Sequence, residues 1–282
     1  MTDPPPTTQP TPALPASRAG RDLPAAIGVG VALGVVIVAS LFVLKPLFLL
    51  VVLAAGTLGM WELASALATR GVRVPLVPVV VGGWAMLAGS YLGGSEVLSV
   101  AVALTGLACL LWRLVEGADG FVADATAGVF VVSYVPLLGS FVVLMLAEPD
   151  GAWRVATFIV VVVASDVGGY AVGASLGKHP MAPTISPKKS WEGFAGSTAA
   201  CLVAGVLMVT LGLAGPWWAG AVLAVITACL ATLGDLGESL IKRDLGVKDM
   251  GSLLPGHGGM MDRLDSLLAV APVAWLVLHT LV

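Results

Sequence analysis

Apolar runs of about 20 residues recur along almost the whole chain after residue 22. Hydrophobic residues make up 58% of the 282 residues and charged residues only 11%, which is more apolar side chain than a water-soluble domain of this length can bury. Such a run crosses the ~30 Å hydrocarbon core of a bilayer as a helix, and a helix satisfies its own backbone polar groups in lipid. We therefore predict an all-α polytopic membrane protein.

The hydropathy pattern predicts about nine transmembrane helices. The first apolar run lacks the basic segment directly ahead of it that a cleavable signal needs, so we expect it to remain as a helix. We expect about five helices in 23–150 and about four, forming the catalytic region, in 151–282. The predicted spans are 23–44, 47–68, 74–93, 95–115, 125–147, 152–175, 194–214, 216–241 and 264–282.

Other features of the chain narrow the function class. Residues 1–22 are rich in Pro and Thr with few large apolar side chains, which predicts a disordered tail. The three cysteines, an odd number inside apolar runs, give no complete disulfide framework, and we assign no chemistry to Cys109, Cys201 and Cys229. A net charge of -3, with basic residues scattered through short loops, argues against nucleic acid as a partner.

The basic residues indicate the orientation of the chain. If the amino terminus is cytosolic, all but two of the 14 Lys and Arg residues fall on the inner side, and only Lys45 and Arg154 fall outside. This distribution follows the positive-inside rule. The same topology places the polar segments 176–193 and 242–263 in the cytosol, where nucleotides and the inner leaflet are both accessible.

The segment 235–265 holds ten of the 31 charged residues. Asp235 and Glu238 are three residues apart, as are Asp262 and Asp265, so on helices each pair presents its carboxylates to one side. Carboxylate oxygens without a set of cysteines or histidines favour a hard cation, Mg²⁺ or Mn²⁺ before zinc. A charged segment is often only a solvated surface, but Asp235 and Asp265 lie at or inside apolar boundaries, where ionisable groups are usually functional.

Between the two acidic pairs lies a segment suited to binding anions. Pro255, Gly256, His257, Gly258 and Gly259 form a Gly-rich turn that runs into a predicted helix at Met260, and backbone N–H groups there would face an anion. His257 alone is a weaker candidate, because a loop histidine between glycines could simply hydrogen-bond the backbone. The segment also contains the charged residues Lys242, Arg243, Lys248 and Asp249.

Two further places carry polar candidates. Asp166 lies inside a predicted span, where a lone carboxylate needs a partner, and it could either bind a ligand or hydrogen-bond a neighbouring helix. Gly168 and Gly169 beside it permit close helix packing or a loosened backbone. Lys188 and Lys189 are compact donors suited to phosphate. Farther from the next span, Lys178 and His179 could be functional or could only anchor the membrane interface.

The run from Ser239 to Asp265, SLIKRDLGVKDMGSLLPGHGGMMDRLD, resembles the long signature of the phosphatidate cytidylyltransferases. The run ISPKKSWEG at 185–193 and the segment around Asp166 resemble two further stretches of that family, so the resemblance covers roughly 155–282. It implies transfer of a cytidylyl group from CTP to phosphatidic acid, giving CDP-diacylglycerol and pyrophosphate. It also implies a homodimer. Together with the predicted topology, the resemblance leads us to expect a cell-membrane protein whose active site faces the cytosol.

The resemblance further implies a role for each matching residue. Asp235 and Asp262 are indicated as ligands of Mg²⁺ or Mn²⁺, with a second cation possible in the same site. The residues indicated as catalytic are Asp166, Lys188, Lys189, Asp249 and Asp265. Those indicated as binding the substrates are Lys242, Arg243, Lys248, His257, Gly258, Gly259 and Arg263.

Two alternatives stay open at this point. A CTP-dependent lipid kinase or a phosphotransferase acting on a CDP-linked lipid would also need paired carboxylates and a divalent cation, although the HGGxxDRxD run favours nucleotidyl transfer. A secondary transporter would use buried carboxylates as well, but its binding site normally lies between repeated halves. Here the ionisable residues gather in the carboxyl-terminal half, with no matching set near the start.

Overall fold

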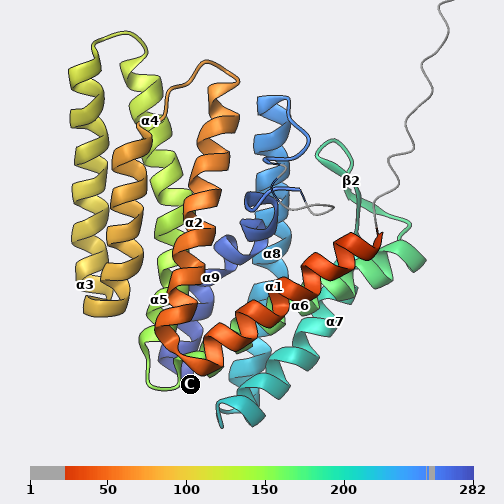
Figure 1. Ribbon diagram of the computed structural model, residues 1–282. Helices are drawn as coiled ribbons and strands as arrows, with labels where there is room; N and C mark the ends of the chain where they lie inside the picture. Colours follow the sequence, from red (N-terminus) through yellow and green to blue (C-terminus); the bar gives the residue numbers. More distant parts are fainter. Residues whose placement is uncertain (1–22, 252, 254–257) are drawn as a thin grey trace, which may run out of the picture.

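A computed structural model describes residues 23–251, 253 and 258–282. The predicted disordered tail and His257 lie outside these residues. The described chain is almost entirely helical, with one β-hairpin between two long helices (Figure 1). Its elements are α1 (Leu23–Val43), α2 (Lys45–Ala68), α3 (Leu76–Glu116), α4 (Phe121–Val132), the π-helical turn η1 (Ser133–Leu137), α5 (Leu138–Ala147), α6 (Gly151–Leu176), β1 (Pro180–Ala182), β2 (Ser186–Ser190), α7 (Trp191–Leu207), the π-helical turn η2 (Met208–Gly212), α8 (Trp217–Leu245) and α9 (Met261–Leu281).

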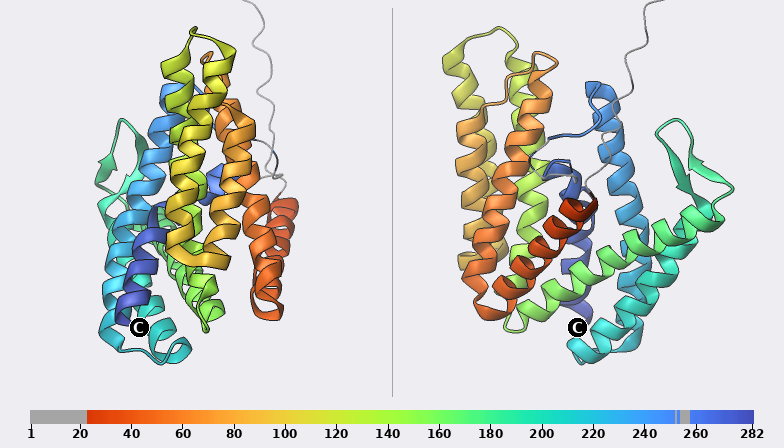
Figure 2. Two further views of the ribbon diagram at one scale, coloured as in Figure 1. Left: turned by 90° about the vertical axis from the view of Figure 1, so that its left-hand side faces the viewer. Right: turned by 45° about the vertical axis from the view of Figure 1, so that its right-hand side comes forward.

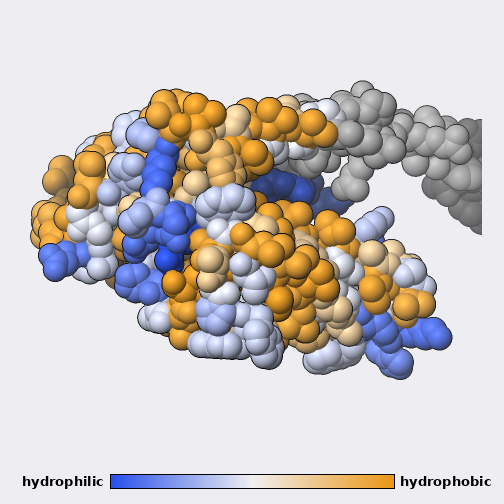
Figure 3. Space-filling model, turned by 90° about the horizontal axis from the view of Figure 1, so that it is seen from below, coloured by the Kyte–Doolittle hydropathy of each residue, from blue (hydrophilic) through white to orange (hydrophobic). Residues whose placement is uncertain are grey.

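Seven helical segments among the described residues are long and apolar enough to cross a membrane. They are Lys45–Ala68, Leu76–Glu116, Phe121–Ala147, Gly151–Leu176, Trp191–Gly212, Trp217–Leu245 and Met261–Leu281, and a shorter apolar helical stretch covers Gly30–Val43. Hydrophobic residues cover much of the face seen in Figure 3, and hydrophilic residues gather there in separate patches. The prediction of an all-α polytopic membrane protein is confirmed, while the number nine stays a prediction.

The 41-residue helix α3 is broken near its middle. Gly94 has φ 65° and ψ -155°, a conformation that glycine adopts without the steric cost that a side chain would bring. The chain reverses there, so that the two arms of α3 run side by side in opposite directions (Figure 1). These arms correspond to the separate spans predicted at 74–93 and 95–115.

Two apolar cores hold the helices together, and α9 takes part in both. One core lies mainly among α2, α3, α4 and α5, and it includes Met261 and Leu268 of α9. The other lies mainly among α5, α6, α7 and α8, and it includes Val270, Ala274 and Leu278 of α9. The helix α9 therefore lies between the two halves of the chain, as the right-hand view of Figure 2 shows.

Lys45 and Arg154, the two basic residues predicted to lie outside, meet at one end of the molecule. The ammonium of Lys45 donates to the backbone carbonyls of Glu148 and Pro149, after α5. The guanidinium of Arg154 donates to the Asp150 carboxylate (2.6 Å) and to the carbonyl of Leu278 near the end of α9. The structure thus places these two residues together, and the side of the membrane they face stays a prediction.

Candidate active site

Close packing of α6 against α7 positions the first site residue, Asp166. A Cβ atom on Gly168 would lie 2.6 Å from the carbonyl oxygen of Gly196, so the two backbones approach closely because neither residue has a side chain. The hydroxyl of Ser197 on α7 donates to the carbonyl of Ser165 on α6 (2.7 Å). The expectation that the glycines beside Asp166 permit close helix packing is confirmed.

The polar segment between α6 and α7 folds into an antiparallel hairpin of β1 and β2. Glu192, in the first turn of α7, closes its base by accepting hydrogen bonds from the amides of Lys178 (3.1 Å) and His179 (3.2 Å), and its Oε1 lies 2.5 Å from His179 Nδ1. Lys178 and His179 are exposed at this base and do not line the cavity described next.

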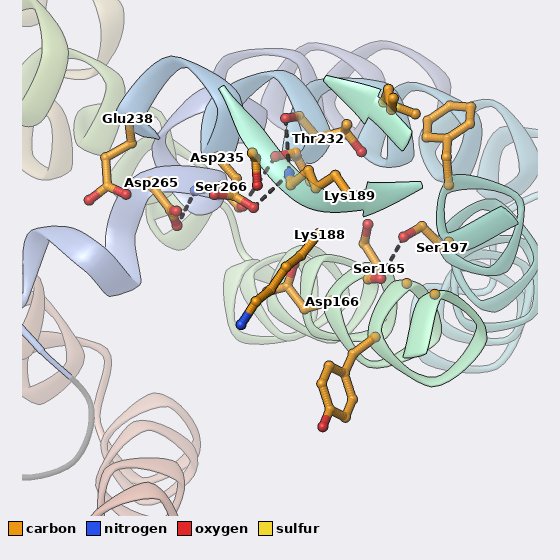
Figure 4. A pocket seen from close by; sticks show the side chains of 18 of the residues that line it. Ser165, Asp166, Lys188, Lys189, Ser197, Thr232, Asp235, Glu238, Asp265 and Ser266 are labelled. Carbon is orange, nitrogen blue, oxygen red and sulfur yellow. Dashed lines mark hydrogen bonds and ion pairs between the residues drawn. The ribbon is translucent and has the colours of Figure 1, made fainter. Parts of the chain in front are cut away.

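A cavity of about 510 Å³ lies between the hairpin and the helices α6, α7, α8 and α9. Figure 4 shows that its charged side chains come from elements far apart in the sequence. Among the predicted site residues, those that line it are Asp166, Lys188, Lys189, Asp235, Lys242, Asp249, Asp262, Arg263 and Asp265. The structure therefore brings most of the predicted site together. Arg243, Lys248, Gly258 and Gly259 are not among the lining residues.

Three carboxylates gather on one side of this cavity. Asp235 and Glu238 on α8 and Asp265 on α9 each offer an oxygen, and these oxygens lie within 4.8 Å of one another. Glu238 is only 1% exposed, and its Oε1 has no hydrogen-bond partner within the described part of the chain. A buried carboxylate oxygen is costly unless it is paired or coordinated. The prediction that Asp235 and Glu238 face one side of their helix is confirmed.

The charge balance of the cavity fits a divalent cation. Six acidic and four basic residues are among its lining residues, which leaves an excess of two negative charges. Mg²⁺ and Mn²⁺ prefer oxygen ligands of the kind that Asp235, Glu238 and Asp265 provide. These residues therefore fit the predicted hard cation, and the identity of the ion stays a prediction.

Asp262, which the signature indicates as a ligand, has three hydrogen-bond donors of its own. Its carboxylate accepts from Lys242 Nζ (2.9 Å), the amide of Gly259 (2.8 Å) and the amide of Met250 (3.1 Å). Lys242 Nζ also pairs with Glu238 Oε2 at 2.5 Å and so bridges the two carboxylates. Asp262 is thus linked to the acidic cluster through Lys242, and its role as a cation ligand stays a prediction.

Two backbone amides at the start of α9 donate to carboxylates of the protein. The amide of Gly259 donates to Asp262, and the amide of Met261 donates to Glu62 Oε2 (2.8 Å). In the described residues, these two amides are thus directed to carboxylates of the protein itself. Gly258 has φ 82° and lies beside Asp262. The predicted role of Gly258 and Gly259 in nucleotide binding is therefore untested, and both have a local role around Asp262.

The basic residues of the hairpin and of α8 have distinct partners. Lys189 Nζ pairs with Asp235 Oδ2 (2.6 Å) and donates to the Thr232 carbonyl (3.3 Å), whereas Lys188 extends in a different direction (Figure 4). Arg243 Nε donates to the carbonyl of Ile185 (2.5 Å), between the two strands, and so ties the hairpin to α8. Lys248 is exposed beyond the end of α8.

Sequence reasoning gave Glu62 no role. Glu62 lies on α2, in the amino-terminal half, yet its carboxylate is 1% exposed and contacts the start of α9. An ionisable residue inside an apolar span was the available signal, because such residues are usually functional. No partner for it could be named, because α2 and α9 are about 200 residues apart.

The fold and the cavity define a class of protein: a polytopic membrane enzyme that acts on phosphate groups with the help of a cation. Carboxylates in the cavity are suited to hold the cation, and ammonium groups are suited to bind the phosphates. The family model "Cytidylyltransferase family" matches residues 24–281. A phosphatidate cytidylyltransferase of Mycobacterium leprae is 44% identical over 94% of this chain and 90% of its own length. One of Mycobacterium bovis is 41% identical over 96% and 92%, and one of Brucella suis is 36% identical over 69% and 72%. This chain belongs to the cytidylyltransferase family.

The match confirms the resemblance that the signature indicated. It also extends the likeness beyond 155–282, because the family model begins at residue 24. The amino-terminal helices are therefore part of the pattern that the family shares.

Proposed function

We propose that this chain transfers the cytidylyl group of CTP to phosphatidic acid, giving CDP-diacylglycerol and pyrophosphate. The observation that carries the proposal is the cluster of Asp235, Glu238 and Asp265 in a cavity lined by lysines, in a chain whose relatives are named phosphatidate cytidylyltransferases. An oxygen of the lipid phosphate attacks the α-phosphorus of CTP. The bond from that phosphorus to the bridging oxygen of the β-phosphate breaks, and pyrophosphate leaves with the electron pair.

The chain's own residues would act by position and charge. The lipid phosphate is already an anionic nucleophile, so the reaction needs no strong general base, and alignment of the two substrates supplies most of the rate. Lys188 extends into the cavity and is suited to hold a substrate phosphate. Arg263 lines the same cavity, while Lys189 and Lys242 hold the carboxylates Asp235, Glu238 and Asp262 in place.

Asp235, Glu238 and Asp265 would hold Mg²⁺ or Mn²⁺, with Asp262 and Asp166 available in the same cavity for a second cation. When bound, a divalent cation would neutralise the triphosphate and the departing pyrophosphate. Asp249, which is exposed at the cavity, adds to the negative charge there.

We also propose nine membrane spans, a cytosolic amino terminus and a location in the cell membrane. The meeting of Lys45 and Arg154 at one end of the molecule supports this orientation, because the positive-inside rule assigns the end with few basic residues to the outer side. The cavity lies toward the other end of α8, and it would then face the cytosol and the inner leaflet. A homodimer, as the family resemblance implies, is testable by the mass of the detergent-solubilised protein.

The experiment that tests the reaction is a product assay on the purified protein in detergent. With CTP, phosphatidic acid and Mg²⁺, we expect equal amounts of pyrophosphate and CDP-diacylglycerol, loss of both with a chelator, and recovery on adding Mg²⁺ or Mn²⁺. Release of CDP together with a phosphorylated lipid would instead identify a CTP-dependent lipid kinase. Absence of any product that depends on both substrates would reject the proposal.

A further inference from the structure

Glu62 is a buried carboxylate of the amino-terminal half that the proposed reaction leaves without a role. It lies on α2, and its carboxylate oxygen Oε2 accepts the amide of Met261, the first residue of α9, at 2.8 Å. Its other oxygen, Oε1, is buried without a hydrogen-bond partner among the described residues. A carboxylate placed this way contributes little to stability, since an apolar side chain of similar size would avoid the cost of desolvation.

Two of the described glycines ahead of α9, Gly251 and Gly259, lie against this carboxylate. A Cβ atom on Gly251 would lie 2.2 Å from Glu62 Oε1, and its three nearest atoms would all belong to Glu62. A Cβ atom on Gly259 would lie 2.5 Å from Glu62 Oε2. Neither glycine has a positive φ. At Gly251 the Glu62 carboxylate takes up the space that a side chain would need, and at Gly259 this space is taken by the same carboxylate and by the backbone nitrogen of Gly251 (2.7 Å).

The same segment holds the site carboxylates of α9. The amides of Met250 and Gly259 donate to Asp262, and Gly259 also lies against Glu62. Asp265 follows one helical turn later and completes the cluster with Asp235 and Glu238. A shift of the backbone around Gly251 and Gly259 would therefore displace both carboxylates.

We propose that Glu62 is a positioning residue, which fixes the start of α9 so that Asp262 and Asp265 lie correctly in the cavity. The inference rests on the proposed function for its catalytic readout. It gives the amino-terminal half of the chain an indirect part in the active site, through one carboxylate of α2. Glu62 does not line the cavity, so its effect passes through the segment it holds.

The test is a double-mutant cycle between Glu62 and Gly251. Glu62→Ala leaves the Met261 amide without its acceptor, and Gly251→Ala forces a methyl group against the carboxylate. Each change should lower kcat by about 10- to 100-fold, because small misplacements of catalytic groups have effects of this size, with a smaller change in KM for CTP. In the double variant the clash is gone, so kcat should be no lower than in Glu62→Ala alone. Multiplication of the two effects would overturn the proposal.

Further variants separate positioning from simple loss of stability. Glu62→Gln keeps a carbonyl oxygen for the Met261 amide and should retain more activity than Glu62→Ala. Asp124→Asn removes another buried carboxylate of the amino-terminal half, one that does not contact this segment. If Asp124→Asn lowers kcat as much as a Glu62 variant with the same unfolding midpoint, or if Glu62→Ala keeps the wild-type kcat, the proposal is rejected.

The unfolding midpoint in detergent provides a second readout of the cycle. Gly251→Ala should lower this midpoint, and the double variant should not lower it further than Glu62→Ala does. Both results are expected even if the wild-type protein makes no CDP-diacylglycerol, so failure of the proposed function is distinguishable from failure of this inference. Should Glu62→Ala not fold, Glu62→Asp replaces it in the cycle, because the shorter side chain also withdraws from Gly251. Additive midpoint shifts in both cycles would overturn the contact itself.

Discussion

Buried charges occur in both halves of the molecule, and the Arg113 group of the amino-terminal half differs from the cavity of the carboxyl-terminal half in how far its charges are paired with one another. In the amino-terminal half, Arg113 of α3 is 3% exposed and pairs with Asp124 of α4 (2.8 Å) and with Glu116. Asp124 also accepts the amide of Arg73 at 2.7 Å. In the carboxyl-terminal half, six acidic residues face four basic ones around the cavity, and Glu238 keeps an unpartnered oxygen among the described residues.

The difference separates a structural ion pair from a binding site. A buried charge whose partner is supplied by the same fold needs nothing else, and removing that partner is costly. A group of carboxylates with too few cations nearby is tolerated when a ligand completes it. We therefore assign the Arg113 group to stability and the cavity to chemistry, and the following variants test that assignment.

The largest loss of kcat is expected when a carboxylate of the cavity is replaced. Asp235→Asn removes one charge from the cluster and the partner of Lys189, with almost no change in shape. We expect kcat to fall by about 10²- to 10³-fold, the size seen when a charge-stabilising group is removed from an active site, and the concentration of Mg²⁺ needed for half-maximal activity to rise. Asp124→Asn is the matched control, and its kcat per folded molecule should stay near that of the wild type. Equal losses in the two variants would contradict the assignment.

Breaking the ion pair between Arg113 and Asp124 should instead lower stability strongly and leave the activity of the folded protein unchanged. Arg113→Leu leaves Asp124 buried without its cation, which destabilises proteins by about 3–5 kcal/mol. The unfolding midpoint in detergent should drop by several degrees, while the activity of the protein that remains folded is kept. A loss of activity with an unchanged midpoint would show that the amino-terminal group belongs to the chemistry after all.

The sequence predicted the helices and the spacing of site residues along one helix, but it did not predict contacts between distant segments. The helices followed from apolar runs, because the membrane admits few other structures, and even the turn at Gly94 was marked by adjacent glycines. Site residues on neighbouring turns of one helix, such as Asp235 and Glu238, followed from helical spacing. Contacts between distant segments did not follow, because no local pattern connects Glu62 with Met261 or Arg243 with the carbonyl of Ile185.

The two lysines near the ends of the hairpin segment offer a sharper comparison within the active half. Lys188 extends into the cavity, whereas Lys178 is exposed at the hairpin base. Lys188→Ala should raise KM for CTP or for phosphatidic acid by about tenfold, the effect of losing roughly 1.4 kcal/mol of binding free energy. Lys178→Ala should leave both constants within about twofold, since an exposed charge contributes little. Steady-state kinetics with each substrate varied in turn would decide, and equal behaviour of the two variants would return Lys188 to a membrane anchor.

The smallest effect is expected from Arg243, and it distinguishes a phosphate ligand from a structural tether. The signature suggested that Arg243 binds a substrate phosphate, but its guanidinium donates to the Ile185 carbonyl and does not line the cavity. Loss of one hydrogen bond from a charged donor at an exposed position would loosen the hairpin without removing a ligand. We expect Arg243→Gln to change kcat/KM by only about two- to fivefold, and to increase protease cleavage within the hairpin. A loss as large as that of Lys188→Ala, with unchanged cleavage, would show that Arg243 turns to the substrate during the reaction, and the boundary of the active site would then extend along α8 to that residue.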